Sequence, residues 1–254
     1  MMASGAASVA RGPDFARTNR FLASLPLHDY LLLAPHLRTV TLEQGTVLHD
    51  AGEPIEHVYF PHSGMVSVVT IMRNGDAVET ASLGREGVIG ATAGLGAGRT
   101  IGRAIVQLDG VTSRLASSQF RAAARESEAI RELALRYNDL LIAQIQQSVA
   151  CIALHTVEAR LCRWLLQTHD CVDGDSIPLT QEFLAQMLGV RRTSVTIAAR
   201  LLQNAGMIRY RRGHIQVVDR AALEDAACEC YATLKERAYD VFRCRQHSVC
   251  GRHP

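Results

Sequence analysis

Residues 119–169 contain neither glycine nor proline, and this stretch divides the chain into two parts of different character. In the part before it, short runs rich in Val, Ile and Tyr are interrupted by glycines at roughly the 8 to 12 residue spacing of an all-β sandwich or barrel. Glycine and proline commonly end helices, so a long stretch without them favours helix. We therefore predict an α+β protein in which a β domain precedes a helical one.

The β part is predicted to be an antiparallel β-roll, jelly-roll-like, over residues 20–118. Asn74 and Gly75 separate two apolar runs, and both residue types tolerate positive φ, which favours a β-hairpin at this point. The glycines that punctuate the apolar runs are Gly45, Gly52, Gly64, Gly75, Gly84 and Gly87. Their repeated spacing indicates several short strands joined by turns.

Residues 119–155 are predicted to form one long helix with two apolar stripes. The first stripe contains Ile130, Leu133, Tyr137 and Leu140, and the second contains Leu141, Ile145, Val149 and Ile152. A helix packed on one surface needs one apolar face, so the second stripe predicts a second partner. The same helix of another subunit supplies it in an isologous homodimer, while burial inside one chain is the alternative. The polar residues that continue the first stripe are expected to set the register of the paired helices, namely Gln144, Gln147 and Cys151.

Residues 156–220 are predicted to fold as a winged helix-turn-helix. Thr180 stands where a helix N-cap belongs, and Gly189 suits the left-handed turn that ends a short helix. A second helix follows this turn, and two extended segments then flank a basic hairpin tip. The expected elements are a helix over 157–169, a helix between Thr180 and Gly189, a helix over 192–204, and extended segments over 207–209 and 214–218.

Positive charge is concentrated in this predicted domain. The whole chain carries 27 Lys and Arg against 25 Asp and Glu, and Lys235 is its only lysine. Between residues 179 and 220, only Glu182 and Asp219 oppose seven arginines, which stand at positions 191, 192, 200, 209, 211, 212 and 220. A basic patch on a small module is the electrostatic pattern of a nucleic-acid binder.

Two stretches carry a family resemblance. Residues 179–196 read LTQEFLAQMLGVRRTSVT, and the hairpin over 208–215 reads IRYRRGHI. Together with the order of the domains, they resemble the Crp/Fnr superfamily of bacterial transcription regulators over roughly residues 20–220. The resemblance implies a homodimeric, sequence-specific regulator that binds double-stranded DNA, with RNA polymerase as a further candidate partner.

The residue types after the predicted turn suit DNA recognition, because a recognition helix enters the major groove by its N-terminal end. Arg192 is predicted to contact guanine, since a guanidinium can bond O6 and N7 together. Arg191 and Ser194 are expected to hold phosphates, whereas Thr193 and Thr196 are expected at base edges or thymine methyls. The full predicted set is Thr180, Arg191, Arg192, Thr193, Ser194, Thr196, Arg200, Arg211 and Arg212.

The predicted reading helix departs from that of the cyclic-AMP-binding member of the superfamily. Thr193 and Ile197 stand where that member has an acidic and a second basic base-reading residue. The DNA site is therefore expected to differ. A two-fold dimer should read a pseudo-palindrome whose half-site centres lie about one helical turn, 34 to 36 Å, apart.

The β-roll carries only part of a phosphate-binding motif. In nucleotide-binding relatives, a Gly-Glu pair is followed after about ten residues by Arg and Ser or Thr, which hold the phosphate. Here Gly90 is followed by Ala91, so the carboxylate that would hold a ribose hydroxyl is missing and cyclic-nucleotide control is disfavoured. Gly90, Arg99 and Thr100 remain candidates for binding an effector anion. The effector is not identified, and no cofactor is assigned.

All seven cysteines lie at or after Cys151, and they are expected to be reduced. An iron–sulfur cluster held near the N-terminus is excluded, because no thiolate lies there. Haem ligation is disfavoured, since the available histidines are more commonly surface or hydrogen-bonded residues, namely His28, His36, His49, His57 and His62. A metal site in the tail lacks the usual spacer between ligand pairs, and its candidate ligands are Cys244, His247, Cys250 and His253.

Other classes of function are less well supported. An enzyme on a cupin-like roll needs a His-x-His metal motif, which the sequence lacks, so catalysis is not expected. A sensor module that docks protein instead of DNA stays the alternative. No run reaches the roughly 18 apolar residues of a membrane span, so we expect a cytoplasmic protein without membrane contact. Residues 221–254 are expected to be a helical extension and a tail rich in Cys and His.

Overall fold

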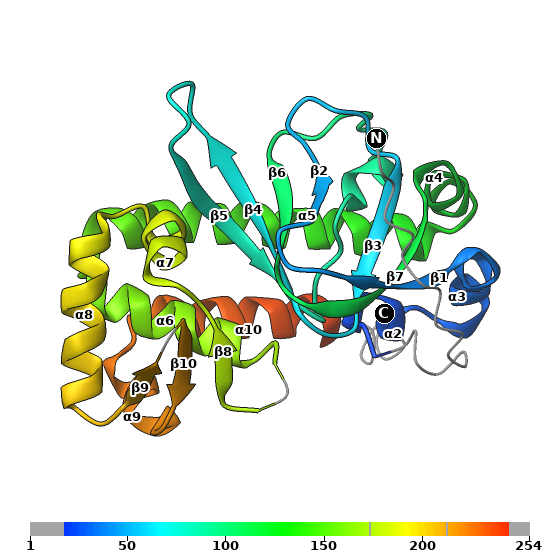
Figure 1. Cartoon of the computed structure of the whole chain (residues 1–254). Helices are drawn as coiled ribbons and strands as arrows, with labels where there is room; N and C mark the ends of the chain where they lie inside the picture. The colour runs from blue at the N-terminus through cyan, green and yellow to red at the C-terminus, as the bar shows by residue number, and fades with distance from the viewer. Residues whose placement is uncertain (1–17, 173, 212, 244–254) are drawn as a thin grey trace, which may run out of the picture.

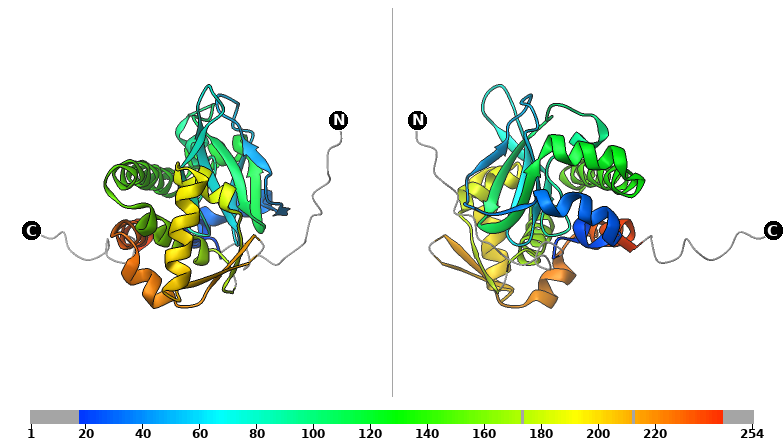
Figure 2. Two further views of the ribbon diagram at one scale, coloured as in Figure 1. Left: turned by 60° about the vertical axis from the view of Figure 1, so that its left-hand side comes forward. Right: turned by 90° about the vertical axis from the view of Figure 1, so that its right-hand side faces the viewer.

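The computed structural model describes residues 18–172, 174–211 and 213–243, which form three connected parts (Figure 1). A roll of β-strands occupies one end, the long helix α5 (Glu128–Leu154) runs behind it, and a helical domain with a small sheet lies at the other end. Helix α10 (Cys230–Arg243) packs alongside α5 (Figure 2). Within the described ranges, no helix combines the length and apolar character needed to cross a membrane.

The N-terminal domain is a roll of two antiparallel sheets, which confirms the predicted β-roll. One sheet has the strand order β1-β7-β3 and the other has the order β2-β6-β4-β5. The hairpin predicted at Asn74 and Gly75 joins β4 to β5, with Gly75 at φ 92°. Helices α2 (Arg20–Ser24) and α3 (Leu27–Leu33) precede the strands β1 (Arg38–Leu42), β2 (Val47–His49), β3 (His57–Pro61), β4 (Met65–Ile71), β5 (Ala77–Leu83), β6 (Arg103–Leu108) and β7 (Gly110–Ala116).

An aromatic cluster holds the roll against the helices. Phe21 of α2, Phe60 of β3, Phe120 of α4 (Ser117–Glu126) and Tyr137 of α5 are fully buried. Their ring centroids lie 5.8 to 6.3 Å apart, within the range of favourable aromatic pairs. This contact fixes the N-terminal half of α5 on the roll.

The single helix predicted over residues 119–155 is in fact two helices, α4 and α5. Ser127 between them has an extended backbone, with φ −108° and ψ 117°, and its hydroxyl accepts a hydrogen bond from the Ile130 N–H at 3.0 Å. The same hydroxyl donates to Oδ1 of the buried Asp29, 2.6 Å away on α3. An N-cap anchored on α3 therefore ends one helix and begins the next. The absence of glycine and proline could not reveal this break.

Helix α5 has the two predicted apolar faces, and the chain itself covers only one of them. The first stripe is buried against the roll, whereas Leu141 of the second stripe is half-buried on the roll and the rest of that stripe is exposed. Five exposed apolar residues of α5 and the half-buried Asn138 are spaced alternately three and four residues apart, as in a coiled coil. We call this pattern the seam, and it consists of Leu135, Asn138, Ile142, Ile145, Val149 and Ile152.

The prediction that Gln144, Gln147 and Cys151 set the register of paired helices is wrong. Gln144 donates to the Ser82 carbonyl on β5 at 3.0 Å, and Gln147 donates to Sγ of Cys230 at 3.1 Å. Cys151 is buried beside Cys228. The roll and the segment that leads into α10 cover the face of α5 that carries these three residues. The spacing of residues along one helix could not predict which other segments pack on it.

The second domain is the predicted winged helix-turn-helix, with one strand that was not anticipated. Strand β8 pairs with β10 and sets Ile177 opposite Ile215, so the wing has three strands in the order β8-β10-β9. The elements are α6 (Val157–His169), β8 (Ser176–Pro178), α7 (Gln181–Leu188), α8 (Arg192–Asn204), β9 (Ile208–Arg211), β10 (His214–Val217) and α9 (Arg220–Ala226).

The winged helix-turn-helix domain and the roll share one hydrophobic core. Met65, Val69 and Leu108 of the roll belong to the same buried cluster as Trp164 of α6. The Trp164 indole Nε1 donates to Oε1 of Glu79 on β5 at 2.9 Å, and the Ser67 hydroxyl donates to Oε2 of the same side chain. The two domains are thus joined by both apolar burial and a buried hydrogen bond.

Burial raises the pKa of Glu79 to about 7, although Ser67, Arg163 and Trp164 act in the opposite direction. The folded chain therefore holds this proton more tightly than the unfolded chain does. The stability that the proton contributes is complete below pH 4.5 and is lost as the pH rises through about 7.

We expect the effect of Glu79→Gln on the free energy of unfolding to depend on pH. Relative to wild type, the variant should be more stable above pH 7 than it is below pH 4.5, and this difference should reach about 3 kcal/mol. The amide is neutral at both pH values, so it has no proton to lose. Urea denaturation of both proteins at the two pH values measures the difference. The exposed Glu236→Gln is the matched control, and a Glu79→Gln effect that is equal at both pH values would contradict the interpretation.

Candidate nucleic-acid interface

Helix α7 begins and ends where the sequence predicts. The Thr180 hydroxyl accepts a hydrogen bond from the Phe183 N–H at 3.2 Å and so caps the helix. Gly189 ends it at φ 62°, and a Cβ there would lie 3.0 Å from Cγ2 of Val78 on β5. Both the left-handed turn and the close approach to the roll favour glycine. This turn fixes the direction in which α8 leaves.

Helix α8 buries one face and exposes its N-terminal end. The buried face consists of Val195, Ala198, Ala199 and Leu202. Arg191, Arg192 and Thr193 are exposed at the first turn, and Arg191 is an N-cap whose side chain makes no capping hydrogen bond. The first N–H groups of a helix lack partners within the helix, so this end favours anions such as phosphate.

Two of the predicted DNA-binding residues are less accessible. Ser194 and Thr196 are half-buried, and the Thr196 hydroxyl donates to Oε1 of Gln181 at 2.8 Å. Thr196 thus faces α7, and its predicted base contact stays a prediction. Arg192 Nε lies 3.9 Å from Oε2 of Glu182, with both side chains well exposed. An exposed pair of this kind contributes little, so Arg192 can turn toward a ligand.

The wing presents part of the predicted basic group. Arg211 is exposed at the end of β9, and Gly213 at φ 82° makes the turn into β10. Arg200 is exposed on α8, whereas Arg212 lies outside the described residues. Arg220, which the charge count included, is held by Asp170 at 2.8 Å and by Glu224 at 3.0 Å. Arg220 therefore has a structural role.

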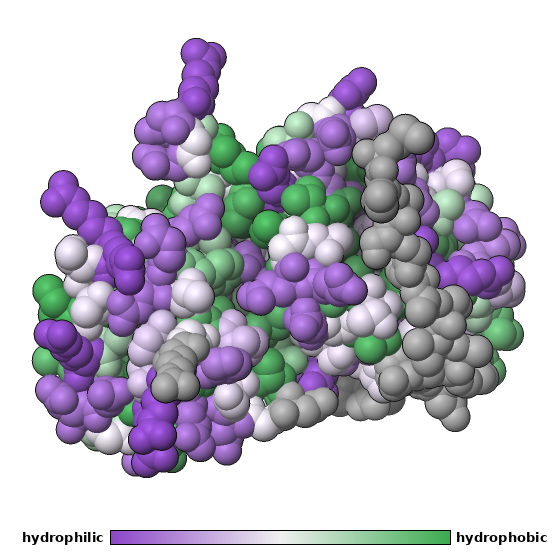
Figure 3. Space-filling model, in the orientation of Figure 1, coloured by the Kyte–Doolittle hydropathy of each residue, from purple (hydrophilic) through white to green (hydrophobic). Residues whose placement is uncertain are grey.

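The surface around these elements is mixed in character. Hydrophilic residues predominate over the wing, while hydrophobic surface shows at the left-hand edge over α8 (Figure 3). Ile197 and Leu201 are exposed on this helix. The sequence did not lead us to assign a contact to Ile197, although its spacing of four from Thr193 places both side chains on one face.

Two family profiles match the chain in the order of its domains. The profile described as "Cyclic nucleotide-binding domain" matches residues 39–127, and the one described as "Crp-like helix-turn-helix domain" matches residues 159–226. Together they cover more than half of the 254 residues. The chain belongs to the Crp/Fnr superfamily. It is accordingly a DNA-binding transcription regulator with an N-terminal sensor domain, as the resemblance implied.

Solved structures share the fold of this Crp/Fnr regulator. FixK2 from Bradyrhizobium japonicum aligns with a TM-score of 0.65 at 15% identity, over 76% of this chain and 98% of that one. TTHB099, a CRP-family transcriptional regulator from Thermus thermophilus, gives 0.60 at 21% identity, over 74% and 95%. CLP from Xanthomonas campestris, described as a c-di-GMP responsive global regulator, gives 0.59 at 13% identity, over 76% and 99%. No curated protein matches the sequence.

Two of the three predicted effector residues of this Crp/Fnr chain bond to the segment between β2 and β3, and the third lies close to His49. A Cβ on Gly90 would lie 2.9 Å from Cε1 of His49. Arg99 donates through Nη1 to the Gly52 carbonyl at 2.6 Å, and the Thr100 hydroxyl donates to the Asp50 carbonyl. These three residues do not line the cavity of about 540 Å³ that lies between the roll, α5 and α10. Their role in effector binding stays a prediction.

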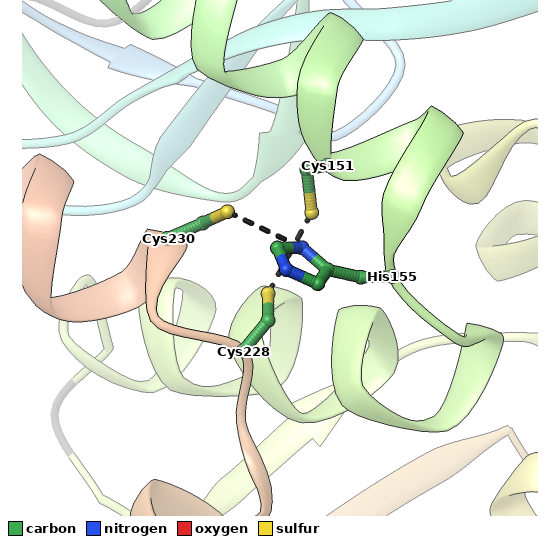
Figure 4. A group of neighbouring side chains, drawn as sticks. All are labelled: Cys151, His155, Cys228 and Cys230. Atoms are coloured by element: carbon green, nitrogen blue, oxygen red, sulfur yellow. Dashed lines mark hydrogen bonds between the residues drawn. The ribbon is translucent and has the colours of Figure 1, made fainter.

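Three cysteines and a histidine meet at the C-terminal end of α5 (Figure 4). Sγ of Cys151 lies 3.6 Å from Sγ of Cys228, and Sγ of Cys230 lies 3.5 Å from Nδ1 of His155. Sequence reasoning missed this group, although Cys-x₃-His at 151–155 and Cys-x-Cys at 228–230 were its signals. The tail residues considered instead lie outside the described residues, namely Cys244, His247, Cys250 and His253.

Proposed function

We propose that this regulator acts as a homodimer that reads a pseudo-palindromic DNA site through the N-terminal ends of its two α8 helices. The observation that carries the proposal is the exposed turn of Arg191, Arg192 and Thr193 on a helix whose opposite face is fixed in the core. The uncovered seam on α5 supports the two-fold contact, because a row of exposed apolar residues at coiled-coil spacing suits a second copy of itself.

The contacts to bases divide by side-chain chemistry. Arg192 is assigned to guanine through O6 and N7, and Thr193 to a neighbouring base edge. Ile197 is 59% exposed on the same face, and we assign it to a thymine methyl group, which apolar side chains recognise in the major groove. Thr196 reaches a base only if it releases Gln181.

The contacts to the DNA backbone position the protein. Phosphates are assigned to Arg191 and Ser194 at the start of α8, and to Thr180 at the start of α7. Arg200 and the wing arginines Arg211 and Arg212 are assigned to the flanking backbone, where they add affinity and salt dependence. A cytoplasmic location and a contact with RNA polymerase belong to the same proposal.

The roll is proposed to sense the signal through its contact with the DNA-binding domain. The Glu79–Trp164 hydrogen bond and the approach of Gly189 to Val78 make that contact sensitive to the position of β5. An effector that binds one arrangement more tightly than another would shift the population of DNA-competent dimers. We assign no effector.

We expect the Arg192→Ala variant to lose its preference for guanine at one base pair in each half-site. Its discrimination against the other bases should fall by about 1–3 kcal/mol per half-site. The reason is the loss of a bidentate guanine contact. The measurement is selection of bound fragments from random DNA, followed by gel shifts on the selected site and on its single-base variants.

Two control variants accompany this experiment. Arg211→Ala should weaken binding to all DNA alike and lower the salt slope by about 1, because it removes a phosphate contact. Arg125→Ala should change neither the DNA affinity nor its salt slope. Arg125 lies on α4, which is at the opposite end of the molecule from α8 in Figure 1. Equal weakening of Arg192→Ala on every DNA sequence would show that Arg192 holds phosphate instead of a base.

A further inference from the structure

We infer that Cys151, His155, Cys228 and Cys230 together bind one Zn²⁺ ion per chain. Three thiolates and one imidazole form a common ligand set of structural zinc. The four donor atoms lie within 4.8 Å of one another, and the three cysteines are buried. The site is separate from both the DNA-reading helix and the predicted effector residues.

The distances fit a single ion. With Zn–S near 2.3 Å, a tetrahedral ion holds two sulfur atoms ~3.8 Å apart, and it holds a sulfur and a nitrogen slightly closer. The observed separations are 3.6 Å between two sulfurs and 3.5 Å between Cys230 Sγ and His155 Nδ1. A disulfide needs an S–S distance of about 2.05 Å and would leave the other two donors unused. An iron–sulfur cluster places several atoms between its thiolates and needs wider spacing.

Two short segments supply the donors. Cys151 lies in the last turn of α5, and His155 is the C-cap residue, whose N–H bonds to the Cys151 carbonyl at 3.1 Å. Cys228 and Cys230 flank Glu229 where α9 leads into α10. In Figure 4 the four side chains converge from these two segments on one point. The spacing of four on a helix and of two on a loop brings each pair together.

The surroundings orient the donors as a metal site requires. Nε2 of His155 lies 3.3 Å from Oε2 of Glu229, while Nδ1 faces the thiols. A metal-binding histidine commonly donates its second N–H to a carboxylate, which fixes the tautomer and the ring. Gln147 donates to Cys230 Sγ at 3.1 Å. These contacts leave the metal-facing atoms aimed at one another.

The local charge also favours a bound anionic complex. Arg160 and Arg163 of α6 are buried, and the Nε atom of each has no hydrogen-bond partner among the described residues. Both guanidinium charges act on Cys151 and Cys228. Three thiolates, a neutral imidazole and Zn²⁺ carry a net charge of −1, which offsets part of the buried positive charge.

The ion would tie the two ends of the DNA-binding domain together. It links the junction of α5 and α6 to the junction of α9 and α10, on either side of the helix-turn-helix. The ligands meet only in the folded chain, so binding free energy adds to folding stability. Removal of the ion should therefore lower the melting temperature.

The test is the zinc content of the full chain, purified in reductant through a tag without histidine and measured by mass spectrometry of the metal. We expect one zinc per chain in wild type and less than about a tenth of that in Cys151→Ser and Cys228→Ser, because direct metal ligands are lost. Cys162→Ser is the matched control, since Cys162 is equally buried but outside the group. Glu229→Ala should weaken zinc binding about 10- to 100-fold.

A second measurement does not depend on the folding of the serine variants. Cobalt added to metal-free wild type should give thiolate charge-transfer and tetrahedral ligand-field bands, and His155→Cys should keep a stoichiometric site. The double variant Cys244→Ser and Cys250→Ser should keep its zinc. Wild type without zinc and without these cobalt bands would overturn the inference. Iron in place of zinc, or zinc lost from the tail variant but kept in Cys228→Ser, would also overturn it.

Discussion

Val149→Glu is expected to convert the dimer to a monomer and to weaken binding to the full DNA site about 100- to 10,000-fold, because the second half-site contact is no longer tethered to the first. Val149 is 65% exposed in the single chain and lies within the seam. The substitution would bury a carboxylate in an apolar contact, beside the same carboxylate of the second subunit. A buried charge without a partner is strongly unfavourable.

Sedimentation measures the oligomeric state of this variant, and gel shifts on a full site and on an isolated half-site measure its affinity. Leu154→Glu is the matched control. Leu154 lies on the same helix and is 78% exposed, but its helical position is opposite the seam. The control should stay dimeric. A Val149→Glu protein that stays dimeric and binds the full site with wild-type affinity would show that α5 is not the dimer contact.

Trp164→Ala is expected to lower the free energy of unfolding by about 3–5 kcal/mol, the range for removing a large buried aromatic side chain. Trp164 is 1% exposed, packs edge-on against Phe183 with ring centroids 6.1 Å apart, and donates to Glu79. The substitution leaves a cavity where the roll meets the DNA-binding domain. Urea denaturation followed by circular dichroism measures the change.

Trp164→Phe separates the contribution of the buried volume from that of the hydrogen bond to Glu79. Phenylalanine fills most of the volume but cannot donate to Glu79, so the loss should be smaller, about 1–3 kcal/mol. The loss should also shrink when Glu79→Gln is already present, since the buried carboxylate is then gone. If Trp164→Ala destabilised the chain by less than about 1 kcal/mol, the shared core would not hold the two domains together.

Elements set by nearby residues were predictable from sequence. The cap at Thr180, the left-handed turn at Gly189 and the hairpin at Gly75 each depend on the conformational preference of one residue and its close neighbours. The helical spacing likewise identified the two apolar stripes of α5 and the inner face of α8. Of the nine predicted DNA-binding residues, Arg191, Arg192 and Thr193 are exposed together on the first turn of α8.

Features that depend on distant residues were not predictable. Ser127 ends a helix because its hydroxyl reaches Asp29, 98 positions away, and serine within a helical pattern carries no such signal. A charge count includes Arg220 with the DNA-binding arginines, although Asp170 and Glu224 hold it. Cys151 falls on a polar continuation of an apolar stripe, and only the return of the chain from α9 reveals its partners.

Sequence alone determined the order of the domains, the helix-turn-helix and the existence of an unpaired apolar face on α5, because periodicity and capping are local properties. Tertiary structure decided which face of α5 the chain itself covers, how the roll and the DNA-binding domain share a core, and that three cysteines and a histidine converge. Those outcomes depend on which distant segments pack together, and single-residue preferences carry no information about that choice.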